Sequence, residues 1–281
     1  MKKTVLLSSL AALLITGCTL SHDNNVGAIK SEKQQVVELL NSIENGSPEP
    51  VAYINQSKYI QHNLAVKDGL AGFGEVLQAL PKGSAKVKVD RVFKDGDFVF
   101  AQTEYSFFGP KAGFDIFRFE NGKIVEHWDN LQPIVEKTAN GHTQFDGSVE
   151  ITDLSKTQEN KTLVKNLVND VFFGKNPNKI TEYISTEKYT QHNPYVKDGL
   201  SGLGEALKSL ADAGMPMEYR VNHKVLGEGN FVLSVSEGNF MKKHVAFYDL
   251  FRIENGKIVE HWDTIEEIPQ EANWKNKNGK F

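Results

Sequence analysis

The chain of 281 residues contains one cysteine, Cys18. A single thiol excludes an intramolecular disulfide, so burial of apolar side chains has to hold the folded parts of the chain together. Basic residues are also too dispersed for a nucleic-acid-binding surface, because the 32 lysines and arginines form no cluster and are outnumbered by 36 acidic residues. We therefore expect no nucleic-acid partner.

Long hydrophobic runs are missing beyond the N-terminus. A membrane-spanning helix needs about 20 predominantly apolar residues in succession. The stretch that comes nearest, residues 5–15, is shorter and is interrupted by two serines. It follows the basic Met1-Lys2-Lys3 and precedes Thr16-Gly17-Cys18, an order typical of a secretion signal.

The residues "LLITGC" at the end of this stretch resemble a bacterial lipobox, in which the cysteine is lipidated and becomes the first residue of the mature protein. We therefore predict a lipoprotein signal peptide at residues 1–17, lipidation of Cys18 and a polar tether at residues 18–30. An ordinary signal peptide with an unrelated cysteine is the alternative. The lipoprotein interpretation places the protein in the cell envelope, anchored to a bacterial membrane and facing outside the cytoplasm.

Two copies of one pattern fill the rest of the chain. "QHNLAVKDGLAGFGE" at 61–75 returns as "QHNPYVKDGLSGLGE" at 191–205, and "FRFENGKIVEHWD" at 117–129 returns as "FRIENGKIVEHWD" at 251–263. Even the ends of the copies are alike, with "NGHTQF" in the first and "KNKNGKF" in the second. A unit of about 120 residues has the size of a domain and is too long for a solenoid repeat. The sequence therefore predicts tandem homologous domains at residues 31–145 (repeat 1) and 156–281 (repeat 2).

Each copy opens with helical patterns and ends with strand patterns. Apolar residues recur at helical spacing within 36–43 and 163–171. A further helix is expected after Asp68 and after Asp198, because aspartate is a favoured N-cap residue. Strand patterns separated by turn signals such as Asn121-Gly122 follow. Helices followed by an antiparallel sheet predict an α+β domain.

The turn of the closing hairpin decides which side chains share a face, because side chains alternate along a strand. If the loop consists of Asn121-Gly122 alone, Asp115 shares a face with Trp128. If the loop is Glu120-Asn121-Gly122, with Gly122 in the left-handed conformation of a bulge, Asp115 lies opposite His127.

We favour the three-residue loop because it places Arg118 and Glu126 on one face as a diagonal ion pair. It also places Ile124 on that face, beside Trp128. The opposite face then gathers acidic side chains with a histidine. These side chains are Asp115, His127 and Asp129 in repeat 1, and Asp249, His261 and Asp263 in repeat 2.

A face with two carboxylates and one imidazole suits proton transfer. Burial beside apolar rings and a neighbouring like charge both raise the pKa of a carboxyl group, which can then donate a hydrogen bond to a developing oxyanion. A histidine titrates in the useful pH range and can act as acid or base. A purely structural role is the alternative, in which Asp115 bonds His127 across the strands and holds the pocket wall together.

The closing residues "DIFRFENGKIVEHWD", preceded by "YIQHN", make each copy similar to the SnoaL-like polyketide cyclases. These belong to the nuclear-transport-factor-2-like superfamily, which includes ketosteroid isomerase. The resemblance covers nearly all of both copies and implies two tandem cone-shaped domains, each with N-terminal helices packed on a curved antiparallel sheet around an internal pocket. It implies less about activity, because the superfamily contains cyclases, isomerases, dehydratases, hydrolases and non-catalytic binders.

Several site residues carry over by position. Asp115 and Asp249 match the aspartate that is protonated in the oxyanion hole of ketosteroid isomerase. Asp129 and Asp263 match the general acid/base aspartate of the cyclases. The histidine that lines the cyclase pocket matches His62 and His192, although the neighbouring asparagine of each could face the pocket instead. No aspartate stands where the isomerase has its base, so steroid isomerisation is not expected.

The resemblance supports two functions. The first is acid/base catalysis without a cofactor, of the cyclase, isomerase or lyase type, on a small hydrophobic carbonyl compound. His62 or Asp129 would abstract a proton, Asp115 would hydrogen-bond the enolate and His127 would orient the carboxylates, with equivalent residues in repeat 2. The second is a lipoprotein that binds a small hydrophobic ligand without catalysis. The further residues expected to contact a ligand are Tyr59, Asn63, Phe117, Tyr189, Asn193 and Phe251.

No spacing of ligand residues indicates a metal site, and no cofactor is expected. Domains of this kind pair through the open face of the sheet, so the tandem could form a covalent pseudo-dimer with Trp128 and Trp262 in the joint. The loops at 107–113 and 239–246 differ between the copies and predict pockets with different preferences.

Overall fold

The computed structural model describes residues 30–80 and 83–281, and Ser31–Phe281 form one compact unit. The predicted signal peptide, Cys18 and the tether up to residue 29 lie outside the described residues. Within the described ranges, no helix is both long enough and apolar enough to cross a membrane.

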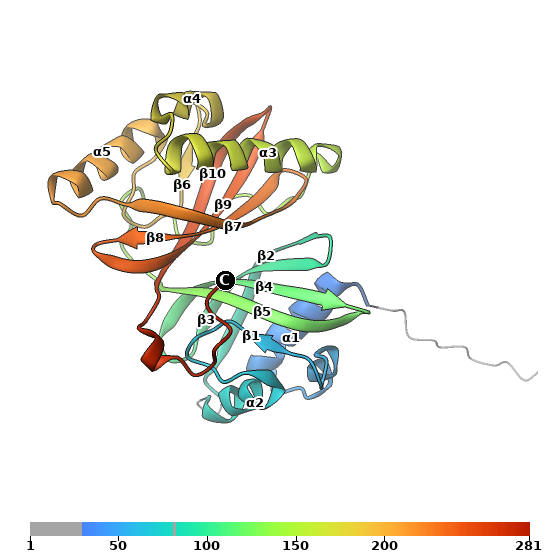
Figure 1. Cartoon of the computed structure of the whole chain (residues 1–281). Coiled ribbons are helices and arrows are strands. Elements are labelled where there is room, and N and C mark those ends of the chain that lie inside the picture. Colours follow the sequence, from blue (N-terminus) through green and yellow to red (C-terminus); the bar gives the residue numbers. More distant parts are fainter. Residues whose placement is uncertain (1–29, 81–82) are drawn as a thin grey trace, which may run out of the picture. The chain divides into compact units, whose positions relative to one another are not determined.

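The fold is α+β, which confirms the class that the order of patterns predicts. In the described part of the chain each repeat contributes helices and one five-stranded sheet (Figure 1). The strand orders are β1-β5-β4-β3-β2 and β6-β10-β9-β8-β7. Four strands of each sheet are antiparallel neighbours, while the short first strand joins the edge in parallel with the last.

The elements of repeat 1 are α1 (Glu32–Asn45), the 3-10 helix η1 (Glu49–Tyr53), β1 (Ile60–Gln61), α2 (Gly69–Ala79), β2 (Lys86–Asp95), β3 (Phe98–Ser106), β4 (Pro110–Glu120) and β5 (Lys123–Pro133). The elements from residue 154 onward are η2 (Leu154–Lys156), α3 (Thr157–Leu167), the π-turn η3 (Val168–Phe172), η4 (Pro177–Lys179), α4 (Ile180–Tyr183), β6 (Thr190–Gln191), α5 (Gly199–Asp212), β7 (Glu218–Glu228), β8 (Phe231–Phe240), β9 (Lys243–Glu254), β10 (Lys257–Glu267) and η5 (Glu271–Asn273).

Local sequence explains where the first helices begin and end. Ser31 and Gln34 form a capping box at the start of α1, and Gly46 ends the helix with a φ of +71° that suits glycine. Asp68 and Asp198 occupy the N-cap positions of α2 and α5, as predicted. Their carboxylates do not cap these helices, however, and accept hydrogen bonds from other segments instead.

The closing hairpin of repeat 1 has a two-residue loop, so the predicted three-residue loop is wrong. Asn121 and Gly122 both have positive φ, +51° and +72°, and together they suffice to reverse the chain. The extra residue lies inside β5 as a bulge at Val125, where the register shifts. Beyond the bulge Asp115 pairs with Asp129, and not with His127 as expected.

The bulge still places the acidic and histidine side chains on one face, as the favoured register predicts. Arg118 pairs directly with Glu126 and forms the expected ion pair. Ile124, which precedes the bulge, packs with Phe117 and Phe119 and not beside Trp128, so its predicted face is wrong. The same shift occurs in repeat 2 between Ile258 and Glu260.

Buried apolar residues form a core within each repeat and a third core that both repeats share. The shared core includes Phe114 and Trp128 from repeat 1 together with Tyr248 and Trp262 from repeat 2. These residues lie on the sheet faces opposite the acidic clusters. Burial of each such side chain contributes about 1.5–3 kcal/mol, so the sheets stabilise each other.

The contacts across the shared core are reciprocal. Arg91 on β2 lies 4.2 Å from the centre of the Trp262 ring, and Lys224 on β7 lies 4.3 Å from that of Trp128. These two cations occupy equivalent strand positions, opposite Gln102 on β3 and Val235 on β8. Each repeat therefore supplies a cation–π contact to the tryptophan of the other.

Candidate functional site

The structure brings Asp115, His127 and Asp129 together on the inner face of the first sheet. One possible ligand atom from each lies within 4.8 Å of the others. Asp115 on β4 is 3% exposed and Asp129 on β5 is 6% exposed, so both carboxyl groups are buried. Repeat 2 assembles the same set, and its members Asp249, His261 and Asp263 are all buried.

A second set of polar side chains holds each group of the first cluster. The Tyr105 hydroxyl donates to Asp115 Oδ2 at 2.8 Å. Asn63 Nδ2 donates to Asp129 Oδ2 at 2.6 Å. Gln61 Oε1 lies 3.1 Å from His127 Nδ1. Tyr219, Asn193 and Gln191 make the equivalent contacts in repeat 2.

These contacts determine where the protons lie. Gln61 Oε1 accepts the backbone N–H of Asn63, so it is the amide oxygen that faces His127 Nδ1, and Nδ1 must carry a hydrogen. His127 Nε2 then faces Asp115 Oδ1 at 3.3 Å. A hydrogen bond between His127 Nε2 and Asp115 therefore needs one proton, carried by either group. The same holds for His261 and Asp249, which are 3.1 Å apart.

Burial and neighbouring groups raise the pKa of three members of the clusters, Asp115, Asp263 and His261. Burial raises the pKa of Asp115, with the nearby Asp129 adding to the effect and the bond to His127 opposing it. Burial likewise raises the pKa of Asp263 to about 6. Burial disfavours the charged form of His261, but the hydrogen bond to Asp249 and the charges of Asp263 and Asp249 outweigh burial and raise the His261 pKa.

One carboxyl oxygen in each cluster lacks a hydrogen bond. Asp129 Oδ1 and Asp263 Oδ1 are buried and have no hydrogen-bond partner among the described residues. Buried carboxylate oxygens normally accept hydrogen bonds, so an unpartnered one is costly unless a ligand or a proton occupies it. The clusters therefore combine a proton that can be donated with an oxygen that can accept one.

His62 and His192 do not join the clusters, which contradicts the expectation that either acts as a base in the pocket. His62 stacks on Trp128 with ring centres 4.6 Å apart, and its Nε2 contacts Glu126 at 2.9 Å, on the opposite face of the sheet. His192 stacks on Trp262 in the same way. Neighbouring residues of an extended segment point to opposite sides, so the asparagine of each pair reaches the acidic cluster.

The tyrosines that hold Asp115 and Asp249 come from different strands. Strands β3 and β8 correspond, because Phe98 and Phe231 pair with equivalent arginines. Tyr105 on β3 therefore corresponds to Gly238 on β8. The hydroxyl in repeat 2 comes instead from Tyr219 on the neighbouring β7, opposite Gly238.

Each tyrosine ring is accommodated by a residue on a neighbouring strand, Gly113 in repeat 1 and Phe247 in repeat 2. In repeat 1 a Cβ on Gly113 would lie 2.5 Å from the Tyr105 ring, so glycine is required beside it. In repeat 2 the equivalent of Gly113 is Phe247, which packs against Tyr219 with ring centres 4.1 Å apart. Sequence reasoning missed both tyrosines, because alignment of the two copies does not put them at the same position.

The space around the two clusters differs. A cavity of about 100 Å³ opens beside the first cluster, and Asp115, His127 and Asp129 line it. The expected ligand contacts Tyr59, Asn63 and Phe117 also line this cavity. In repeat 2, Tyr219 packs against both Phe172 and Phe247 in the corresponding interior. Tyr189 and Phe251 belong to the apolar core of repeat 2, against which Phe172 also packs.

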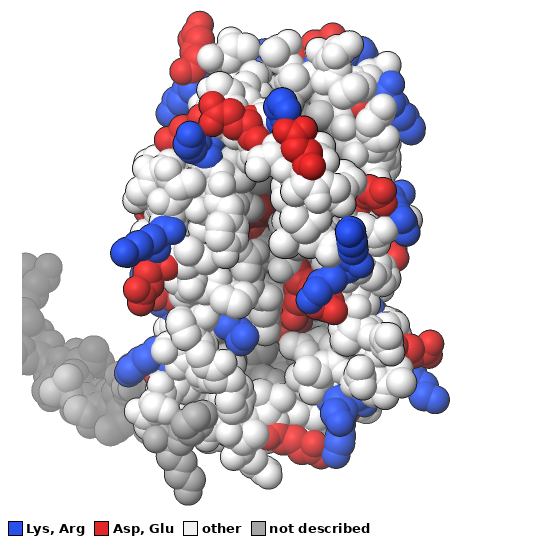
Figure 2. All heavy atoms as spheres, turned by 90° about the vertical axis from the view of Figure 1, so that its left-hand side faces the viewer, with Lys and Arg blue, Asp and Glu red and all other residues white. Residues whose placement is uncertain are grey.

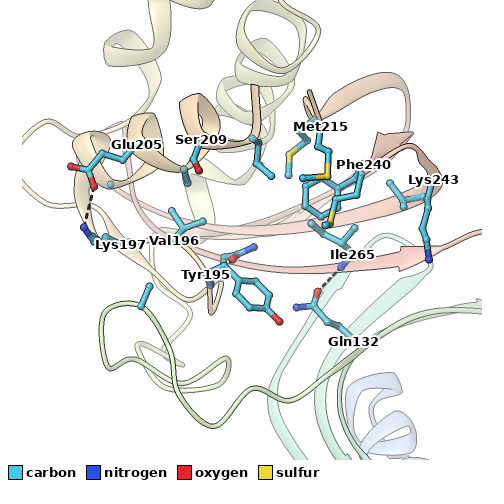
Figure 3. Close-up of a pocket in the computed structure, with 18 of the residues that line it drawn as sticks. Gln132, Tyr195, Val196, Lys197, Glu205, Ser209, Met215, Phe240, Lys243 and Ile265 are labelled. Carbon is cyan, nitrogen blue, oxygen red and sulfur yellow. Dashed lines mark hydrogen bonds and ion pairs between the residues drawn. The ribbon is translucent and has the colours of Figure 1, made fainter. Parts of the chain in front are cut away.

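A larger pocket of about 1010 Å³ lies next to the cluster of repeat 2 and is lined mostly by residues of repeat 2, with Gln132, Pro133 and Ala139 from repeat 1 (Figure 3). Asn193 lines this pocket and also bonds Asp263, whereas Asp249, His261 and Asp263 themselves do not line it. Met215, Phe240 and Ile265 gather on one side of it in Figure 3. On the hollowed face in Figure 2, lysine and arginine are interspersed with aspartate and glutamate among uncharged residues.

Two carboxylates and an imidazole are also donors that a divalent metal ion accepts. In repeat 1 these donors are Asp115, His127 and Asp129, and one ligand atom of each lies within 4.8 Å of the others. The contact of Asp115 Oδ1 with His127 Nε2 is also explained by a hydrogen bond without an ion.

Comparison with known proteins finds no matching family model and no matching curated protein. Solved structures match over 35–42% of this chain, which is about the length of one repeat. TsrD from Streptomyces laurentii is 20% identical, over 37% of this chain and 92% of that one, with a TM-score of 0.31. IdmH, a putative polyketide cyclase from Streptomyces antibioticus, is 17% identical over 35% and 90%, with a TM-score of 0.31. An NTF2-like protein of unknown function from Cytophaga hutchinsonii is 14% identical over 37% and 91%, with a TM-score of 0.32. Matches at this level do not identify a function.

Proposed function

We propose that the chain is an exported, lipid-anchored protein whose two SnoaL-like sites carry out acid/base catalysis on a small hydrophobic carbonyl compound without a cofactor. The observation that carries this proposal is the Asp115–His127 hydrogen bond next to an Asp129 oxygen that lacks a hydrogen bond, in a cavity lined mostly by apolar side chains. The hydroxyl of Tyr219, which comes from a different strand than Tyr105, keeps the equivalent carboxyl group of repeat 2 hydrogen-bonded in the same way.

The geometry assigns a role to each group. Asp129 Oδ1 accepts a proton from the carbon next to the substrate carbonyl, and the electron pair of the broken C–H bond moves onto the carbonyl oxygen. The proton held between Asp115 and His127 hydrogen-bonds the resulting enolate. In ring closure the enolate carbon attacks a second carbonyl, and the alkoxide that forms takes the proton from Asp129. In isomerisation a conjugated enolate takes that proton at a different carbon, so that the double bond moves. Asp263, Asp249 and His261 act equivalently on a substrate that reaches them from the large pocket, whose lining residue Asn193 bonds Asp263.

Exchange of deuterium into the α-position of an apolar β-diketone, followed by NMR, tests this function. In a variant that retains only the repeat 2 site, Asp129→Asn, exchange should rise with pH and be half-maximal near pH 6, because Asp263 must be ionised to act as base and its pKa is about 6. Exchange no faster than that of heat-unfolded protein across the pH range would rule the function out.

The large pocket of repeat 2 favours a second candidate, binding of an apolar ligand without turnover. Three of the four methionines, at positions 215, 217 and 241, line it. Methionine side chains are flexible and polarisable and adapt to varied apolar ligands. A volume of about 1010 Å³ also exceeds what a small diketone would fill.

Filling this pocket should abolish binding of an apolar fluorescent probe. Ala206 on α5 lines the pocket and is partly buried, so Ala206→Trp should weaken binding of anilinonaphthalene sulfonate by at least about tenfold. Ala211→Trp is the matched control, because Ala211 is exposed on the same helix and does not line the pocket. Equal binding by both variants would contradict a ligand site here.

The export proposal has its own test. Cys18 is the only residue that a lipobox could acylate. Cys18→Ser should therefore move the protein from the membrane fraction to the soluble fraction and abolish labelling by radioactive palmitate. Unchanged membrane attachment of the variant would show that the signal acts in another way.

A further inference from the structure

The C-terminal segment of each repeat lies on the other repeat. Asn278 in the tail of repeat 2 donates from Nδ2 to the Gln61 carbonyl at 3.0 Å and to Asp68 Oδ1 at 2.8 Å. Asn140, just after the sheet of repeat 1, makes the same two bonds to repeat 2, at 2.7 and 2.8 Å. The similar endings "NGHTQF" and "KNKNGKF" therefore serve as exchanged tails.

Both tails also reach the histidines behind the acidic clusters. The Gly279 carbonyl lies 2.9 Å from His62 Nδ1, and the Thr143 carbonyl lies 2.9 Å from His192 Nδ1. The residue after His62 is Asn63, whose side chain bonds Asp129. The tail of repeat 2 therefore holds residues 61–63, from which two side chains contact the cluster of repeat 1. The tail of repeat 1 holds residues 191–193 of repeat 2 in the same way.

One residue breaks the equivalence of the tails. Lys280 is only 5% exposed, and its Nζ donates to the Asp129 carbonyl at 2.8 Å and to Glu266 at 2.5 Å. The same Nζ lies 3.8 Å from Asp129 Oδ1, the oxygen that lacks a hydrogen bond. Among the described residues, Asp263 in repeat 2 has no lysine or arginine as an ion-pair partner.

We propose that Lys280 is a positioning residue of the repeat 1 site, supplied by the tail of repeat 2, and that it makes two otherwise matching sites differ in charge. The inference deepens the proposed function, since it names what distinguishes the two sites. A buried ammonium beside a carboxylate stabilises the negative charge and fixes the side chain. In repeat 1 the proposed base Asp129 thus has a lysine beside it that stabilises its charge. In the described part of repeat 2, Asp263 has no such cation.

Other groups also act on Asp129 and have to be held constant. The ionisable groups around it come from the segment before β1, from β3, β4, β5, β9 and β10, and from the tail. They are Tyr59, Tyr105, Asp115, His127, Tyr248, Glu266 and Lys280. Glu266 is the nearest of them to Lys280, and loss of the lysine alone would leave its carboxylate buried without a cation. The comparison therefore has to include Glu266→Gln.

The test is a pH titration of Asp129 by NMR, with aspartate carboxyl groups labelled with ¹³C and the signal assigned by its absence in Asp129→Asn. We compare the single variant Glu266→Gln with the double variant Glu266→Gln/Lys280→Met. The titration midpoint of Asp129 should be higher in the double variant by at least about one pH unit. The Asp263 midpoint should not change. Lys277→Met is the matched control, because Lys277 is an exposed lysine in the same tail.

An unchanged Asp129 midpoint in the folded double variant would overturn the proposal, and so would an equal shift of Asp263. Asn278→Ala and Asn140→Ala test the tails themselves, since the first should disturb only the Asp129 signal and the second only that of Asp263. No substrate enters these measurements. Absence of turnover would therefore refute the proposed function alone, while these titrations decide the role of Lys280.

Discussion

Replacement of both Asp129 and Asp263 by asparagine should lower the rate of α-proton exchange by about 10²–10⁴-fold, the range that a positioned general base contributes. Each aspartate has a buried oxygen without a hydrogen-bond partner, and asparagine offers no group there that can take a proton at neutral pH. The single variants Asp129→Asn and Asp263→Asn should each retain the activity of the other site. The rate of deuterium incorporation at saturating diketone measures the effect.

The fold of the double variant should survive, which separates catalysis from structure. Asparagine can still accept the hydrogen bonds from Asn63 and Asn193. Burial holds the pKa of Asp263 at about 6, above its ordinary 3.8. The folded state therefore binds this proton more tightly, and stability is lost as pH rises through this range. Asp263→Asn removes that loss, so its melting temperature at pH 8 should equal or exceed that of the wild type.

A different pattern would show that the acidic clusters are structural. The carboxyl groups hold the pocket wall together if the double variant unfolds at a clearly lower temperature than the wild type and each single variant shows part of that decrease. Full exchange activity in a folded double variant would also exclude Asp129 and Asp263 as bases.

Trp262→Ala should reduce the free energy of unfolding by about 3–5 kcal/mol, the range for removal of a buried aromatic ring. Trp262 is 1% exposed, stacks on His192 and carries Arg91 on its ring. Its indole N–H also donates to the Asp146 carbonyl at 2.9 Å. Loss of the ring would leave a cavity in the core that both repeats share, so we expect both to be destabilised together.

Chemical denaturation followed by fluorescence and by circular dichroism measures this effect. The two signals should change in a single transition at a lower denaturant concentration, since the sheets share a core. Leu154→Ala is the control, because Leu154 is 64% exposed and its loss should change stability by about 0.5 kcal/mol or less. Two separate transitions in the wild type would show that the repeats unfold independently.

The two-copy architecture and the membership of the acidic clusters could be predicted from the sequence because both depend on neighbouring residues. Alternation along β4 and β5 puts Asp115, His127 and Asp129 on one face as long as the hairpin accommodates one extra residue, either in the turn or within β5. The location of that extra residue was predicted wrongly. Asn121 tolerates positive φ, so the loop needs only two residues and the bulge moves into the strand.

The partners of the clusters could not be predicted, because they come from strands and tails far away in the chain. Tyr105 and Tyr219 occupy unrelated positions in the two copies and meet equivalent aspartates only once the sheets are assembled. Lys280 reaches Asp129 across 151 positions of sequence. His62 looked like a pocket residue, yet stacking on Trp128 places it on the other side of the sheet.

The sequence by itself determined the duplication, the α+β class and the sharing of one face by two acids and a histidine, because repetition and period-two alternation are local properties of the chain. Only the tertiary structure decided which hydroxyl, amide and ammonium groups surround that face, and how much space lies beside it. Those features depend on strand register, on ring-and-glycine packing between neighbouring strands and on the exchange of tails, and none of these interactions is encoded within a single segment.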